Sequence, residues 1–400
     1  MMMSSPVVRQ AVLCQSSFFF SLLTETSNDN LVWETVLTQT AEAFETLRKA
    51  LQYIENADIA QHMHGTVRIL ASILQVQRFE IAVLSFDNCR AHLFAALALF
   101  EHLMRSSVPA IEDPKLQFQS VLDRLGPTSR LLPGLSIEVQ SAEQAAFTFS
   151  TALLILDDIV ASTILQEPPR LYEYHRALLY ATTDSPPVVD VESVIGCQNV
   201  VLLQIGEASN LDTWKQQRKR AGNLDVMELV RRAMSIKDAL ENHLGSLTSI
   251  SANTSWRTGT LLDQTCALAD GDQRLFVTRI WGHAALLFLS VVVSGWQPAN
   301  TEVQHHVGAL LDLLDLQKHP PALLRSVAWP FCVAGCLAMP SQEARFRAHM
   351  QALGRTSIFG ALRKASKIME DVWRSRDSED RSNRDLATFF RTEGDLVLLV

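Results

Sequence analysis

Cysteines are few in this 400-residue sequence, and they are scattered along it. The six cysteines are Cys14, Cys89, Cys197, Cys266, Cys332 and Cys336. Only the last two lie near each other, and most have apolar neighbours. A small fold held by disulfides needs a dense, paired framework, so such a fold is not favoured. We expect the buried thiols of an intracellular protein.

Glycine, proline and charged residues are also scarce. The chain has 16 Gly and 14 Pro, no low-complexity tract, and 20% charged residues against 48% hydrophobic ones. This composition excludes a disordered protein and allows a substantial core. The net charge is −8, whereas a chain that grips nucleic acid by itself needs a clustered excess of Lys and Arg. We expect no DNA-binding residues, although a local basic patch stays open.

Long hydrophobic runs are missing. The longest, residues 284–293, is about half the length that a bilayer requires. Residues 1–23 contain an apolar patch with a single positive side chain, Arg9, before it, which does not favour a secretory signal. We expect no membrane span, no membrane partner and no cofactor, and we interpret residues 1–30 as a partly disordered segment.

Apolar residues recur at helical spacing along most of the chain, without a convincing strand pattern or a fixed-period repeat. Residues 276–296 predict a central buried helix that Gly295 would end. Residues 225–247 predict an amphipathic helix, and the polar stretch 248–260 is interpreted as irregular. The apolar face expected for the amphipathic helix contains Val226, Leu229, Val230, Ala233, Ile236 and Leu240.

The predicted fold class is therefore all-α, a single large multi-helix bundle over residues 31–400. Residues 106–135 are rich in Pro and Gly. We interpret them as a connection across one helical body rather than a linker between independent domains, because the composition does not change abruptly on either side.

The C-terminal region combines two helical patterns. The segment WPFCVAGC, residues 329–336, is apolar nearly all round and predicts a buried helix. Residues 358–377 have apolar side chains on one face and charged ones on the other, so they predict an amphipathic helix. We expect Trp329 and Trp373 to be buried anchors of these helices.

Three pairs of residues resemble parts of a metal site: Cys332 and Cys336, His62 and His64, and His305 and His306. The two cysteines lie one helical turn apart, but a closed zinc site needs four ligands, and no other Cys or His lies close in sequence. Adjacent residues on a helix point about 100° apart, so the adjacent histidines are poorly placed to hold one ion. We interpret the thiols as buried and the histidines as solvated or capping, and we expect no metal.

The pair Asp157 and Asp158 raises the question of catalysis. All-α isoprenoid-processing enzymes bind magnesium and diphosphate with carboxylates repeated a turn apart, together with a second acidic or polar metal-binding motif. Here Ile159-Val160-Ala161 follows the pair, so the repeat is missing. No phosphate-binding glycine loop and no nucleophile elbow occurs. We expect no catalytic residue and no enzyme.

A basic run lies at residues 215–220, with Lys215, Arg218, Lys219 and Arg220. One interpretation is a nuclear import signal or a patch that contacts phosphate. The other is a solvated helix end, since Lys and Arg favour the last turn of a helix. Both interpretations stay open from the sequence.

Four stretches in the same order resemble the fungal-specific transcription factor domain, the helical regulatory region of ascomycete zinc-cluster regulators. They cover residues 86–97, 143–176, 195–215 and 284–377. The resemblance includes a His-Leu followed by a helix of small residues, and a Tyr-His-Arg turn. Its signature residues are Gly196, Cys197, Trp214, Gly295, Trp329, Pro330, Gly335, Cys336, Trp373, Arg376 and Asp377.

This resemblance implies a nuclear transcriptional regulator, in some relatives of a secondary-metabolite gene cluster. It also implies contacts with other transcription factors or coactivators, as a homodimer or heterodimer. Relatives usually carry a six-cysteine zinc cluster near the N-terminus, whereas the first hundred residues here hold only Cys14 and Cys89. We therefore expect that module to be absent from this sequence, which leaves two interpretations. The chain contacts DNA indirectly, through a DNA-binding partner, or the sequence comes from a gene model or paralogue that has lost its first exon.

Two other functions remain to be weighed against this one. The first is a helical protein-interaction or scaffold protein with no part in transcription. The second is the all-α isoprenoid-type enzyme, which the missing aspartate repeat disfavours.

Overall fold

The computed structural model describes residues 63–82, 88–107, 112–130, 138–181, 186–253, 261–316, 321–354, 360–376, 386–390 and 396–400, with seven single residues before them. Nearly all of this part is helical. Its only strands are β1 (Ser129–Arg130) and β2 (Glu138–Val139), which pair antiparallel. The prediction of an all-α fold is confirmed.

The chain divides into two compact units. The first comprises Met1–Asp158 and Glu173–Val189, and the second comprises Ile159–Tyr172 and Asp190–Val400. The division falls inside helix α6 (Ala142–Leu165), so each unit contains part of it. A single bundle over residues 31–400 stays a prediction.

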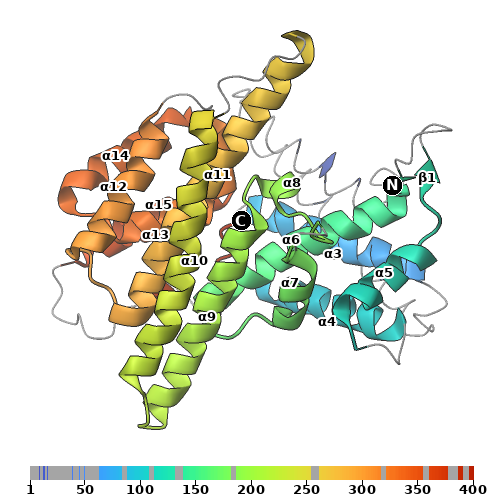
Figure 1. The fold of residues 1–400 in the computed structure, drawn as a ribbon, viewed down its shortest axis with the longest axis horizontal. Coiled ribbons are helices and arrows are strands. Elements are labelled where there is room, and N and C mark those ends of the chain that lie inside the picture. Colours follow the sequence, from blue (N-terminus) through green and yellow to red (C-terminus); the bar gives the residue numbers. More distant parts are fainter. Residues whose placement is uncertain are drawn as a thin grey trace. The chain divides into compact units, whose positions relative to one another are not determined.

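The first unit has an aromatic centre. Phe100, Phe118 and Phe147 are all fully buried. The ring centroids of Phe118 and Phe147 lie 5.0 Å apart, and Tyr174 meets Phe100 edge-on at 5.5 Å. Such pairs contribute beyond the area they bury. The helices of this unit are α3 (Met63–Ala82), α4 (Cys89–Ser107), α5 (Pro114–Arg124), the first part of α6 and most of α7 (Tyr172–Leu179) (Figure 1).

Local capping sets where two of these helices begin. Pro114 is in the first turn of α5, where its missing N–H costs nothing, and the Asp113 side chain caps the helix. The predicted connection over residues 106–135 therefore contains a helix. At the start of α6, Ser141 and Gln144 exchange side-chain and backbone hydrogen bonds of 2.8 and 3.2 Å, which is a capping box.

The second unit holds the longest helices. In Figure 1, α9, α10 and α11 run side by side, and α13 packs against α11 and α15. Its elements are α8 (Glu192–Ile195), α9 (Asn199–Arg220), α10 (Val226–Asn253), α11 (Leu261–Ser294), α12 (Thr301–Asp315), the 3-10 helix η3 (Pro321–Val327), α13 (Ala328–Cys336), α14 (Pro340–Ala352), α15 (Ala361–Arg374) and α16 (Leu386–Phe390).

Two predicted boundaries in this unit are wrong. Residues 248–253 belong to α10 and are not irregular, and α11 begins at Leu261 rather than at residue 276. Small polar residues have weak helix propensity, but adding residues to an existing helix costs much less than starting a new one, so α10 extends through them. The stop is as predicted: Gly295 has a φ of 78°, a left-handed conformation that glycine adopts without strain. Residues 254–260 lie outside the described part.

The predicted apolar face of α10 is wrong in two places. Leu229, Ala233 and Leu240 are buried, as is Ile236, but Val226 and Val230 are exposed. Val230 lies about 90° around the helix from the centre of the buried face, so the apolar arc is wider than the surface that covers it.

Two helices of the described part are long and apolar enough to cross a membrane. They are Ala142–Leu165 and the portion Gly271–Ser294 of α11, and 78% of the apolar window of each is buried within the protein. Core helices pass the same test of length and composition.

Helix α13 approaches α15 at a glycine. An ideal Cβ on Gly335 would lie 1.9 Å from Met369 Sδ and 2.8 Å from Met369 Cγ. Both distances are far below a van der Waals contact, so only hydrogen fits at position 335.

We predict that Gly335→Ala lowers the free energy of unfolding by about 1–3 kcal/mol, because the added methyl group forces the two helices apart. The matched control is Gly308→Ala in α12, where a Cβ would meet nothing within 4 Å. This control should be neutral or stabilise by up to about 1 kcal/mol. Equal effects of the two substitutions on urea unfolding would contradict the packing.

Candidate functional site

The signature residues of the C-terminal region gather around the last turn of α13. Every residue of this helix is buried, and its mean hydropathy is high. The last four carbonyl groups of an α-helix have no donor within the helix, and a buried end gives them no water. The backbone N–H groups of Leu337 and Ala338 donate to the Ala334 and Gly335 carbonyls, at 3.1 and 3.2 Å, and further donors come from side chains of other segments.

Two indole groups supply the first donors. Trp373 Nε1 of α15 donates to the Gly335 carbonyl at 2.8 Å, and this bond is fully buried. Trp296 Nε1, just after α11, donates to the Cys336 carbonyl at 3.1 Å. Buried Trp side chains usually find a partner for the N–H, and here both partners are on one helix end.

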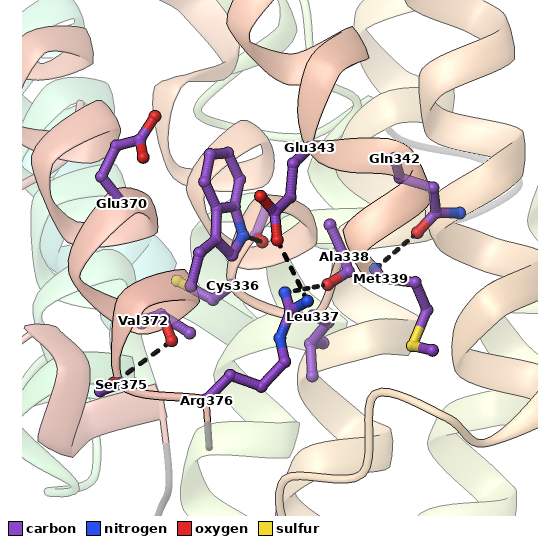
Figure 2. A network of polar contacts seen from close by, with 12 residues as sticks. Cys336, Leu337, Ala338, Met339, Gln342, Glu343, Glu370, Val372, Ser375 and Arg376 are labelled. Atoms are coloured by element: carbon purple, nitrogen blue, oxygen red, sulfur yellow. Dashed lines mark hydrogen bonds and ion pairs between the residues drawn. The ribbon is translucent and has the colours of Figure 1, made fainter. Parts of the chain in front are cut away.

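An amide and a guanidinium supply the next two donors. Gln304 Nε2 of α12 donates to the Leu337 carbonyl at 3.3 Å. Arg376 Nη2 donates to the Ala338 carbonyl at 2.7 Å, and Arg376 Nη1 pairs with Glu343 Oε1 of α14 at 3.1 Å (Figure 2). The positive charge of Arg376 also lies at the negative end of the α13 dipole. Four successive carbonyls, those of residues 335–338, thus accept from four side chains, which come from three segments of the chain.

A charged side chain, Arg347, covers the opposite side of the Trp373 ring. The Arg347 guanidinium lies over its ring at 4.7 Å, and Arg347 Nε donates to Glu370 Oε1 at 2.6 Å. The Arg347 hydrogen bond holds the pKa of the Glu370 carboxyl below its usual range, although partial burial opposes this. These contacts fix the indole between α13 and α14.

Trp329 anchors the start of the same helix. It is fully buried and stacks on Trp281 of α11 with ring centroids 5.4 Å apart. Its Nε1 donates to Thr163 Oγ1 at 3.1 Å. Pro330 occupies the first turn of α13, where a proline is tolerated. The prediction that Trp329 and Trp373 are buried is confirmed.

The remaining signature residues lie elsewhere in the second unit. Gly196 ends α8 with a φ of 80°, and Thr278 Oγ1 donates to its carbonyl at 3.2 Å. Cys197 is buried, and burial raises the pKa of its thiol well above the usual value. Trp214 lies under the Arg232 guanidinium at 4.5 Å. Asp377 lies outside the described residues.

The basic run divides into two parts with different surroundings. Lys215 Nζ donates to the carbonyls of Val292 and Val293 at the end of α11, the second at 3.4 Å. Residues 218–220 form the last turn of α9 and are exposed. Lys215 therefore caps a neighbouring helix, whereas the other three basic residues face solvent.

The two histidine pairs of the sequence have different surroundings. His305 and His306 meet edge-on, with ring centroids 5.1 Å apart. His62 lies outside the described part, and His64 Nδ1 lies 2.8 Å from Glu143 Oε2. His305 is exposed, whereas His306 is buried and faces His283 of α11, with 3.2 Å between the two Nδ1 atoms. Burial, together with neighbouring positive charge, lowers the pKa of His283 and of His306 to about 4.

The cysteine and aspartate pairs also have local partners. Cys332 and Cys336 are buried, and the pKa of Cys332 is raised well above its usual value by burial and by its neighbour. Asp157 pairs with Arg78, and Asp158 Oδ2 lies 3.1 Å from His175 Nε2. Burial raises the pKa of Asp157 to about 6, although Arg78 opposes this. No group of three potential metal ligands occurs among the described residues.

Sequence reasoning missed Trp296, Gln304 and His283. For Trp296, the available signal was its position directly after Gly295, the residue that ends the helix. The roles of Gln304 and His283 depend on partners in other helices, so no local pattern indicates them.

We predict that Trp373→Ala lowers the free energy of unfolding by about 3–5 kcal/mol, since it empties a large buried site. Trp373→Phe keeps most of the apolar ring and removes the indole donor to Gly335, whose carbonyl still accepts from the Ala338 backbone N–H at 3.2 Å, so it should cost about 1–2 kcal/mol. The control is Trp214→Phe, because the Trp214 indole lies under Arg232 and donates to no carbonyl of α13. Chemical denaturation measures all three, and a neutral Trp373→Phe would contradict the capping role.

The His283–His306 pair predicts a stability that falls in acid. Because the folded pKa of each is about 4 and the ordinary value is 6.5, the unfolded chain binds more protons between these pH values. The free energy of unfolding should therefore fall as the pH drops from 6.5 to 4, by about 3 kcal/mol per histidine at most.

The measurement is denaturant unfolding at several pH values between 7 and 4.5. His306→Leu should remove about half of this slope, because His283 stays buried. The exposed neighbour gives a comparison variant, His305→Gln, which removes only a smaller charge contribution to both pKa shifts and should keep most of the slope. The difference between the two profiles isolates the pair, because buried Asp157, whose pKa is raised to about 6, has the opposite effect in both proteins. Identical profiles of the wild type and His306→Leu would contradict the buried neutral pair.

Comparison of the whole chain with known proteins identifies related sequences. The model of the fungal-specific transcription factor domain matches residues 1–398. The transcription factor dibT of Pestalotiopsis microspora is 33% identical over 96% of this chain and 63% of its own length. The trichothecene biosynthesis transcription regulator TRI10 of Fusarium sporotrichioides is 29% identical over 93% of this chain and 83% of its own length.

A third relative is the ustiloxin B cluster transcription factor ustR of Aspergillus flavus, 25% identical over 94% of this chain and 64% of its own length. The chain thus spans somewhat less than two thirds of dibT and of ustR. No solved structure matches it. Because the family model covers almost every residue, the chain belongs to the fungal-specific transcription factor domain family.

Proposed function

We propose that this chain is the regulatory part of a nuclear transcriptional regulator that controls a secondary-metabolite gene cluster in a fungus. The observation that carries the proposal is the family match over residues 1–398. The names of two relatives support the finer role, since TRI10 regulates trichothecene biosynthesis and ustR belongs to the ustiloxin B cluster.

We further propose that DNA contact is supplied from outside these 400 residues. The net charge is −8, and the six cysteines are spread between residues 14 and 336 instead of lying in one short zinc-binding stretch. Phosphate binding needs a clustered positive charge. A DNA-binding partner would therefore carry the chain to promoters, and the helical units would contact other transcription factors or coactivators.

The buried carboxylates support a role without catalysis. Asp157 is fully buried against Arg78, and Asp158 is paired with His175 in the same unit. A magnesium site for diphosphate needs carboxylates that are free to reach an ion on one face. Both carboxylates instead face cationic or imidazole partners inside the first unit, which supports a regulatory function.

The test is chromatin immunoprecipitation of the tagged full chain in its native host, together with transcript profiling of a deletion strain. We predict enrichment at the promoters of one biosynthetic gene cluster and loss of the transcripts of that cluster. Mass spectrometry of the co-purifying proteins should recover a zinc-cluster protein. An untagged strain is the control.

One result would contradict the proposal. The tagged chain would be excluded from the nucleus, and transcript levels would be unchanged after deletion.

A further inference from the structure

The turn that joins α9 to α10 carries a basic end and an apolar stripe on the same hairpin. Residues 217–223 are exposed, and Figure 1 shows the turn at the lower end of these two helices. We define the hairpin tip as residues 218–234. Within it, the chain has five basic and two acidic side chains, against a net charge of −8 for the whole sequence.

The apolar stripe lies on the first half of α10. Its four residues are 60%, 78%, 41% and 47% exposed, which is unusual for large apolar side chains: Val226, Met227, Val230 and Met234. The spacing of 226, 230 and 234 places them one turn apart along one side of the helix. This is the pattern that one helix uses to bind another, and contiguous apolar exposure marks an interaction surface.

The two acidic side chains of the tip are already engaged. Asp225 Oδ1 caps α10 by accepting from the backbone N–H of Met227 at 2.9 Å. Glu228 accepts hydrogen bonds from Arg231 at 2.7 Å and from Arg232 at 2.6 Å. These two arginines hold the pKa of Glu228 at about 2, so it stays ionised and paired.

The basic residues at the end of α9 are not neutralised in this way. Arg218, Lys219 and Arg220 are exposed, and none of the three forms an ion pair with a residue in the described part of the chain. They follow one another in the last turn of α9, directly before the turn that leads to Val226. The stripe is therefore bordered at its N-terminal end by three positive charges that no acidic side chain of the described residues neutralises.

We propose that the hairpin tip binds an acidic amphipathic helix of another protein, with the apolar face of that helix on the stripe and its carboxylates on residues 218–220. The proposal rests on the proposed function, because it names the kind of partner through which the regulator acts. Charge complementarity selects this occupant: a second copy of the chain would bring a second basic tip against the first.

The apolar stripe also indicates that the partner is a protein rather than a nucleic acid. Phosphate groups bind to Lys and Arg and gain nothing from exposed Met and Val side chains. An amphipathic helix uses both features at once, since burial of its apolar face drives association and the charges set its position.

The direct test uses the full chain and a designed probe. The probe is a 20-residue peptide with Leu at every third and fourth position and Glu at the others, labelled for fluorescence anisotropy. The comparison probes are the same peptide with Lys in place of Glu, and a DNA duplex of the same net charge as the Glu peptide. We expect binding of the Glu peptide and at least tenfold weaker binding of the Lys peptide.

Two variants locate the binding on the hairpin tip. The double variant Met227→Gln with Met234→Gln should weaken the Glu peptide at least tenfold at any salt concentration. The triple variant Arg218→Glu, Lys219→Glu and Arg220→Glu should weaken it at low salt and remove most of the salt dependence. All five positions are exposed, so the fold should be retained, and circular dichroism checks this.

The matched control is Val200→Gln. Val200 is 40% exposed and lies near the other end of α9, about 30 Å along the helix from the tip. This variant should bind the Glu peptide as the wild type does. Equal loss with Val200→Gln, tighter binding of the DNA duplex than of the peptide, or a stripe-dependent dimer in light scattering would each overturn the proposal.

A test in the native host separates this proposal from the proposed function. The Met227→Gln, Met234→Gln strain should keep promoter occupancy and lose cluster transcripts. If the wild type occupies no promoter, the proposed function fails, whatever the peptide does. If the wild type occupies promoters and the double variant activates normally, the docking site fails alone.

Discussion

The second unit depends on satisfying the backbone of one buried helix end. Helix α13 is apolar and fully enclosed, so the carbonyls of residues 335–338 have no water to accept from. Each hydrogen bond that they receive contributes about 1 kcal/mol, but a buried carbonyl without a donor costs more than that. The donors come from α12, from α15 and from the residues that follow α11 and α15. The same bonds that satisfy α13 therefore fix its neighbours.

This arrangement explains why the family signature looks as it does. Gly335 is present because Met369 occupies the space of a side chain, and the tryptophans at 329 and 373 combine large apolar area with an N–H donor. Arg376 brings a charge to a helix end of opposite sign. None of these residues faces an exposed site, so the signature encodes stability. The surface of the α9–α10 hairpin, in contrast, keeps apolar and charged groups that the fold itself does not use.

Helical periodicity carried most of the fold prediction. It gave the all-α class, the buried helix at 329–336 and the burial of Trp373, because long apolar patterns dominate local propensity. It failed where the outcome depends on what a neighbouring helix covers. Val226 and Val230 have the right residue type for a core, yet they stay 60% and 41% exposed. His306 pairs with His283 from another helix, and Trp296 with a carbonyl forty residues further along the chain. Such pairings are fixed only by tertiary packing.

The capped end of α13 has a consequence for how the chain is made. Its donors lie at residues 296, 304, 373 and 376, so two of the four are translated well after the carbonyls that need them. While the ribosome has not yet released residue 376, helix α13 cannot be enclosed without leaving carbonyls unsatisfied. We therefore expect the second unit to close late in synthesis, once α15 and residue 376 have emerged. Until then we expect the apolar residues of α13, which are buried in the folded chain, to stay accessible.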